Sequence, residues 1–113
     1  MRKDDSVYLR HVSDAIDRIE EYTGDLTYKG FLKNHLRQDA AIRQIEVIGE
    51  AVKKLSSEFK KGHPDIPWKD VAGMRDKLIH DYFGVDLDAV WDTIEKDIPQ
   101  LRDKLRAIIE TRQ

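Results

Sequence analysis

The chain has 113 residues, of which 40% are hydrophobic and 37% are charged, and it contains no cysteine. This length suffices for one domain, here residues 1–113, and the lack of cysteine excludes disulfides and thiolate metal sites. The formal net charge is -2 and the pI is about 6.1, which argues against a strongly basic nucleic-acid-binding surface. With no apolar run near the ~20 residues of a membrane span and no signal-peptide pattern, we expect a soluble, cytoplasmic protein.

Amphipathic segments with a helical period make up most of the chain. The last of them contains Pro99, which should kink the helix or split it in two. Short links between such segments predict an all-α fold, an antiparallel bundle of four to five helices. The expected helices cover residues 5–22, 34–59, 68–83 and 86–111, with a short helical turn at 28–32 and a loop at 60–67.

The predicted helix over residues 34–59 has an apolar arc wider than one core-facing stripe requires. A helix with two apolar faces usually has two neighbours, and one of them could be a second copy of the chain. Gly49, in the middle of this helix, costs ~1 kcal/mol relative to alanine. Close approach of another helix would explain it, although a merely tolerated glycine is the alternative. The second apolar row consists of Leu36, Ala40, Val47 and Ala51.

The stretch from Arg75 to Tyr82 reads Arg-Asp-Lys-Leu-Ile-His-Asp-Tyr and contains side chains suited to phosphodiester chemistry. The imidazole of His80 can move a proton near neutral pH, and the guanidinium of Arg75 can bind a phosphate through paired donors. Asp76 lies four residues before His80, so on one helix it could fix the imidazole tautomer. A metal site built from Asp76, His80 and Asp81 fits the spacing poorly, and we predict neither a metal nor another cofactor.

Helical geometry raises two questions about Arg75. Its position falls within the apolar arc of its helix, so it must extend to solvent, pair with a carboxylate such as Glu46 or Glu50, or meet a ligand. His80 lies about 140° further round the helix, so one helix cannot easily aim both side chains at one atom. Either the helix distorts near Gly84, or two copies meet so that each supplies an Arg and a His to a shared cleft.

A small basic cleft also remains possible despite the acidic pI. The cationic residues that could build it are Lys53, Lys54, Lys60, Lys61, Arg75 and Lys77. Ordinary solvated charge is the alternative for most of these lysines.

The motif Arg75-x4-His80-x-Tyr82 resembles the signature of HEPN domains, with the tyrosine extension typical of HepT-like toxins. Further blocks resemble the family in the same order along nearly the whole chain, from Ile48-Gly49-Glu50-Ala51 to Asp97-Ile98-Pro99-x-Leu101. An isolated Arg-x4-His pattern would be weak, whereas the ordered set is specific.

The resemblance implies an all-α homodimer in which two Arg-His motifs face each other, and a metal-independent endoribonuclease that acts as the toxin of a type VII-like toxin–antitoxin pair. It implies catalytic roles for Arg75 and His80, supported by Asp76. The implied partners are RNA and an MntA-like minimal nucleotidyltransferase antitoxin, which would silence the toxin by adenylylating Tyr82.

Two other readings of the same residues are possible. The chain could be a non-catalytic dimeric HEPN module that docks a nucleotidyltransferase, which its modest charge favours. It could also be a purely structural bundle, in which case Arg75 should be buried against a glutamate and removal of Glu46 or Glu50 should cost several kcal/mol.

Overall fold

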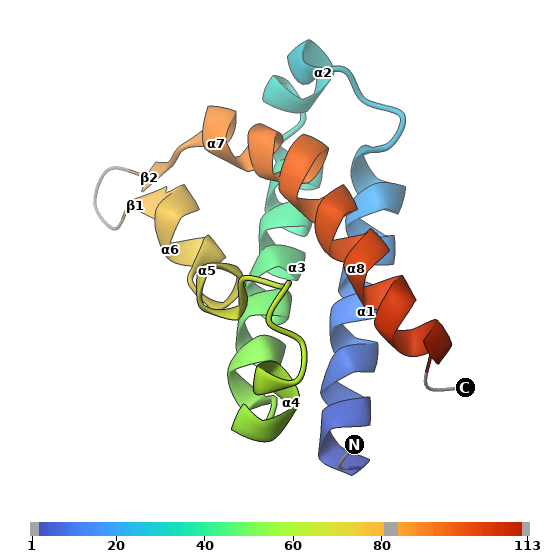
Figure 1. The fold of residues 1–113 in the computed structure, drawn as a ribbon. Coiled ribbons are helices and arrows are strands. Elements are labelled where there is room, and N and C mark those ends of the chain that lie inside the picture. Colours follow the sequence, from blue (N-terminus) through green and yellow to red (C-terminus); the bar gives the residue numbers. More distant parts are fainter. Residues whose placement is uncertain (1–2, 81–83, 112–113) are drawn as a thin grey trace.

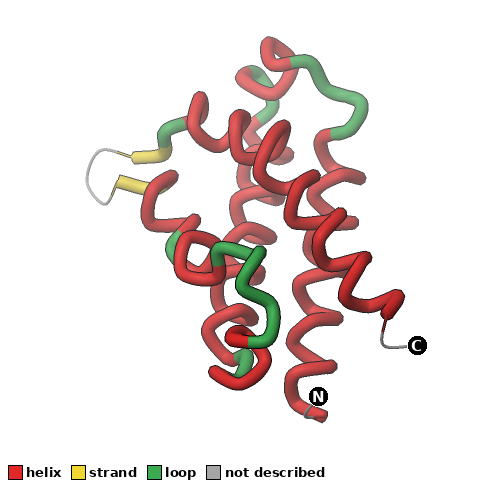
Figure 2. Tube along the Cα trace, in the orientation of Figure 1, coloured by secondary structure: helices red, strands yellow, loops and turns green. Residues whose placement is uncertain are grey.

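Two long antiparallel helices, α1 (Lys3–Thr23) and α3 (His35–Lys54), form the centre of the fold in the computed structural model (Figure 1). The third long helix, α8 (Ile98–Thr111), packs against α1, where Arg102 donates a 2.8 Å hydrogen bond to Glu20. The structure describes residues 3–80 and 84–111. Helices dominate this part of the chain (Figure 2), so the predicted all-α class is confirmed.

Shorter elements surround this centre and share its hydrophobic core, in which Phe31, Ile45, Ile48, Val90 and Ile98 are fully buried. The chain reversal between α1 and α3 carries the expected short helix. No helix within the described residues is both long and apolar enough to cross a membrane. The remaining elements are α2 (Tyr28–Leu32), α4 (Ser57–Lys61), α5 (Trp68–Ala72), α6 (Met74–Leu78), β1 (Ile79–His80), β2 (Gly84–Val85), α7 (Leu87–Asp92) and the π-helix η1 (Thr93–Asp97).

The second predicted helix ends earlier than expected, because the continuous helix over residues 34–59 is broken at Leu55. Leu55 is extended, and the Ser56 side chain accepts a hydrogen bond from the Phe59 amide, which starts α4. The buried carboxylate of Asp5 in α1 accepts hydrogen bonds from the Ser56 amide at 2.8 Å and the Ser56 hydroxyl at 2.7 Å. This contact between distant parts of the chain satisfies the groups that a continuous helix would have paired internally.

We expect Asp5→Ala to lower the free energy of unfolding by about 2 kcal/mol, because the Ser56 amide would lose its partner at a site shielded from water. Chemical denaturation of both proteins measures the difference. Asp4→Ala is the matched control, since Asp4 is exposed on the same helical turn. Equal losses in the two variants would contradict a specific role for Asp5.

The third predicted helix, residues 68–83, is interrupted twice. Gly73 separates α5 from α6, and Ile79 leaves the helix in an extended conformation. A two-residue antiparallel pairing follows, with His80 opposite Gly84, which has a φ of 83°. The Asp86 amide donates a hydrogen bond to the Leu78 carbonyl at 2.9 Å. In a continuing helix, that carbonyl would instead accept from an amide of the next turn.

Gly49 explains how closely this segment approaches α3. A Cβ atom at Gly49 would lie 3.0 Å from the Ala72 carbonyl oxygen, which is tighter than ordinary van der Waals contact. The predicted close approach is therefore confirmed, and the neighbour is α5 of the same chain. Of the second apolar row of α3, Leu36 is 79% exposed, Ala40 and Val47 are partly buried, and Ala51 belongs to the core of the same chain.

The fourth predicted helix begins where expected, with the Asp86 side chain accepting a hydrogen bond from the Ala89 amide. It runs through α7, η1 and α8 to Thr111. The Ile98 amide bonds to the Thr93 carbonyl, five residues back, immediately before Pro99. Proline lacks an amide hydrogen and crowds the carbonyl four residues earlier, so a widened turn at this place accommodates it. The helix is therefore continuous, with a single π turn before Pro99, and the predicted split into two helices does not occur.

Candidate active site

Arg75 projects from α6 into a groove between α3 and the α5–α6 segment. The groove has a volume of about 240 Å³. The Arg75 side chain is 42% exposed, so it lies at the groove surface and not in the core. The groove residues are Glu46, Gly49, Glu50, Lys53, Ala72, Arg75 and Asp76.

Arg75 forms two ion pairs but no hydrogen bond to the carboxylates concerned. Its Nε atom is 3.5 Å from Glu46 Oε2, and its Nη1 atom is 3.6 Å from Asp76 Oδ1. Both distances exceed the ~2.7–2.9 Å of a charge-assisted hydrogen bond. By contrast, Arg102 reaches Glu20 at 2.8 Å. The Arg75 guanidinium is thus held in place electrostatically while its donors stay available to an incoming oxyanion.

This geometry answers the first question that the sequence raised. The predicted pairing with Glu46 is confirmed, and the Arg75 side chain also reaches solvent, which was another of the predicted outcomes. A half-exposed pair does not fit the purely structural reading, which requires a buried one.

Among the residues that the structure describes, the predicted cationic side chains do not gather into one basic cleft. Only Lys53 joins Arg75 in the groove, where three carboxylates accompany them. Lys54 lies over the Tyr8 ring, with 5.8 Å between Nζ and the ring centroid, and Lys77 lines a different cavity. A single groove of this kind holds more negative than positive charge, three carboxylates against two cations, so RNA binding would depend on specific contacts more than on general attraction.

We expect Glu46→Gln to change the free energy of unfolding by less than about 1 kcal/mol, because exposed ion pairs are screened by solvent. Urea denaturation measures this change. A loss of several kcal/mol would instead restore the structural reading of Arg75. Glu50→Gln, in the same groove but without an ion pair to Arg75, is the control.

The other motif residues are placed as follows. Asp76 lies in α6 with its side chain 75% exposed, while the His80 backbone belongs to β1. The argument that Asp76 and His80 share a helical face is therefore wrong, since α6 ends at Leu78. The His80 side chain and all of Tyr82 lie outside the described residues. Among the residues that the structure does describe, no cluster of three or more His, Cys, Asp or Glu could hold a metal ion.

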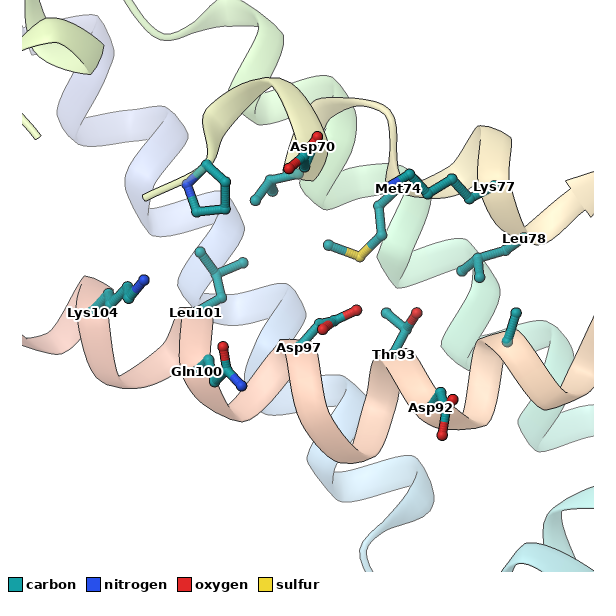
Figure 3. Close-up of a pocket in the computed structure, with 13 residues that line it drawn as sticks. Asp70, Met74, Lys77, Leu78, Asp92, Thr93, Asp97, Gln100, Leu101 and Lys104 are labelled. Atoms are coloured by element: carbon teal, nitrogen blue, oxygen red, sulfur yellow. The ribbon is translucent and has the colours of Figure 1, made fainter. Parts of the chain in front are cut away.

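A larger cavity, which the sequence analysis did not predict, lies between α5–α6 and the helix formed by α7, η1 and α8 (Figure 3). It has a volume of about 400 Å³. In the sequence, this cavity could have been suspected from Thr93, a polar residue next to the apolar stripe of Val90, Ile94 and Ile98. A polar side chain in that place is buried, at 5% exposure.

Comparison with known proteins identifies the family. The model of the family described as "Ribonuclease HepT-like" matches residues 12–108. A Methanocaldococcus jannaschii protein, named as a gamma-glutamylcyclotransferase and candidate RNase, is 50% identical over 110 residues, covering 97% of this chain and 50% of that protein. The chain thus spans about half the length of this relative.

Two other relatives match along almost their full length. The "Probable ribonuclease HepT" of Thermococcus cleftensis is 44% identical over 108 residues, covering 96% of this chain and 98% of that protein. A candidate RNase of Caldanaerobacter subterraneus subsp. tengcongensis is 42% identical over 103 residues, covering 91% and 92% of the two chains. No solved structure shows a significant match. The family model and these relatives show that the chain belongs to the ribonuclease HepT-like family.

Proposed function

We propose that this chain is a metal-independent endoribonuclease and the toxin of a toxin–antitoxin pair, acting in the cytoplasm. The observation that carries the proposal is the state of Arg75, which is half-exposed in a groove with no hydrogen bond to its carboxylate neighbours. An arginine held in this way can bind a phosphate without first breaking a strong pair. Membership of the family supports the choice of RNA as substrate.

The chemistry would use the nucleophile that RNA itself carries. His80 would take the proton of the 2′-hydroxyl or give one to the 5′-oxygen leaving group, and Arg75 would stabilise the charge that develops on the phosphorane oxygens. Attack of the 2′-oxygen on phosphorus breaks the bond to the 5′-oxygen. The products are a 2′,3′-cyclic phosphate and a 5′-hydroxyl end, formed without a metal ion.

A homodimer would complete the site. One groove offers Arg75 and Lys53 against three carboxylates, so a second copy is the natural source of further cationic and acid–base groups. Three of the four residues in the second apolar row of α3 could contribute a surface for it, since Leu36 is 79% exposed and both Ala40 and Val47 are only partly buried, whereas Ala51 lies in the core. Two-fold dimers are the commonest homo-oligomers.

Control of the toxin would come from an MntA-like nucleotidyltransferase antitoxin that transfers AMP to the Tyr82 hydroxyl. The tyrosine oxygen would attack the α-phosphorus of ATP, and pyrophosphate would leave. The attached AMP would add bulk and negative charge two residues from His80. Both effects would oppose the approach of an anionic RNA.

Induction of the chain alone in a bacterial host tests this function, with wild type beside His80→Ala. We expect wild type to arrest growth and to produce RNA with 2′,3′-cyclic phosphate ends, and His80→Ala to do neither. Purified wild type should also cleave RNA in excess EDTA, because no step requires a metal. Cleavage that persists in His80→Ala, or that EDTA abolishes, would contradict the mechanism.

The second candidate is a non-catalytic dimeric module that docks a nucleotidyltransferase. The three carboxylates of the Arg75 groove favour this reading, because they weaken attraction to RNA. Soluble wild-type protein without AMP on Tyr82 that leaves growth and RNA intact would support it. Defined cyclic-phosphate ends exclude it.

A further inference from the structure

The cavity between α5–α6 and the α7–η1–α8 helix is separate from the Arg75 groove, although α6 contributes to both. Met74, Lys77 and Leu78 line the cavity, whereas Arg75 and Asp76 line the groove. Its volume of about 400 Å³ lies in the range of small-molecule sites, and buried apolar side chains form much of its wall (Figure 3). These apolar residues are Val71, Met74, Leu78 and Leu101.

Thr93 gives this apolar wall a polar group without a partner. The residue is 5% exposed, and Figure 3 shows its side chain directed into the cavity, with the hydroxyl on the side of Leu78. The hydroxyls of Thr23 and Thr111 donate to carbonyls of their own helices at 2.7 Å and 2.9 Å. That of Thr93 makes no hydrogen bond to any residue that the structure describes. The hydroxyl oxygen keeps some contact with solvent, so an occupant of the cavity could reach it and form a hydrogen bond with it.

The charges around the cavity restrict the chemistry of that occupant. Three aspartates contribute carboxylates, and Asp97 reaches from η1 toward Met74 (Figure 3). Of the two lysines, Lys104 already donates to the Asp65 carbonyl at 2.7 Å, which leaves Lys77 as an exposed cation at the rim. All three aspartates are exposed, so the mouth of the cavity accepts hydrogen bonds and repels anions. A flat apolar group with N–H donors fits, and a phosphate does not.

We propose that the cavity binds one unpaired, amino-bearing base of single-stranded RNA, that is adenine, cytosine or guanine. The exocyclic amine would donate to Asp97, as carboxylates do to the cytosine amine, and the Thr93 hydroxyl would bond a ring nitrogen. Uracil presents a carbonyl oxygen where cytosine has its amine, so the carboxylate disfavours it. This inference rests on the proposed ribonuclease function and adds a base preference to it.

The position of α6 connects the base to the cleavage site. A strand whose phosphate meets Arg75 on one face of α6 would cross this short helix and place a nearby base against Met74 and Leu78 on the other. Lys77 would then lie beside the intervening phosphate.

Titration of the whole chain with phosphate-free nucleosides, read by NMR at the Met74 and Thr93 methyl groups, tests the site. We expect cytidine to bind about tenfold tighter than uridine, the discrimination typical of one well-placed polar contact. Thr93→Val and Asp97→Asn should each weaken cytidine binding about tenfold without lowering Tm. Glu95→Gln is the control, because Glu95 is exposed on the same π turn and does not line the cavity. Equal binding of cytidine and uridine, or an unchanged affinity in Thr93→Val, would overturn the proposal.

A cleavage assay separates this inference from the function on which it rests. Matched oligonucleotides with cytosine or uracil beside the cleaved bond should differ in rate, and Thr93→Val should remove the difference. Arg75→Ala should stop cleavage and leave cytidine binding intact. Cleavage without nucleoside selectivity overturns the base site alone, whereas selective binding without any cleavage by wild type contradicts the ribonuclease and supports the base site.

Discussion

Replacing Arg75 with alanine is expected to lower RNA cleavage by about a thousand-fold, while the fold and the oligomeric state are retained. The side chain is half-exposed and its two ion pairs are longer than hydrogen bonds, so little stability depends on it. Its charge would matter most in the transition state, when negative charge builds on the phosphorane oxygens. Single-turnover cleavage of a labelled RNA measures the rate, and thermal unfolding checks the fold.

Two variants make this result specific. Arg75→Lys keeps the charge but loses the paired donors, so we expect an intermediate rate. Arg10→Ala removes an exposed arginine from α1, outside the groove, and should leave the rate unchanged. If Arg75→Ala cleaved at the wild-type rate, Arg75 would have no role in catalysis. If Arg10→Ala were equally slow, the loss would reflect general electrostatics instead of a defined contact.

The parts of the fold that local periodicity controls could be predicted closely. The first helix was expected at residues 5–22 and is found at Lys3–Thr23, and α2 matches its predicted range of 28–32. The start of the fourth helix after Asp86 also follows from a local capping signal. In these places the burial pattern and the cap lie within one short window of sequence.

Two of the helix breaks that the sequence did not predict have non-local causes. The break after α3 depends on Asp5. Its carboxylate accepts a hydrogen bond from the Ser56 amide, 51 positions away in the sequence. The end of α6 depends on the Asp86 amide, which donates a hydrogen bond to the Leu78 carbonyl. Helical periodicity continues through both breaks, so tertiary hydrogen bonds decide where the helices stop.

The candidate site shows the same division. Glu46 could be named as a partner of Arg75 because an arginine near an apolar face needs a carboxylate. The acidic character of the groove could not be predicted, since it depends on which face of α3 packs against α6. The cavity beside Thr93 could not be predicted either, because residues from separate predicted helices form its walls.

Mixing two inactive variants is expected to restore cleavage if Arg75 and His80 act across a dimer interface. In a heterodimer of Arg75→Ala and His80→Ala, the intact His80 of one copy meets the intact Arg75 of the other, which rebuilds one of two sites. Random pairing of equal amounts places half of the molecules in heterodimers, so activity should reach about a quarter of wild type.

The physical reason for expecting catalysis across the interface is that the groove of a single copy has more carboxylates than cationic groups. One groove holds Arg75 among three carboxylates, and α6 ends before His80, whose backbone lies in strand β1. The assay is RNA cleavage after the two variants are unfolded together and refolded, with each refolded alone as the control. If the mixture stayed as inactive as its parts although heterodimers were present, Arg75 and His80 would have to act within one chain, and the shared site would be wrong.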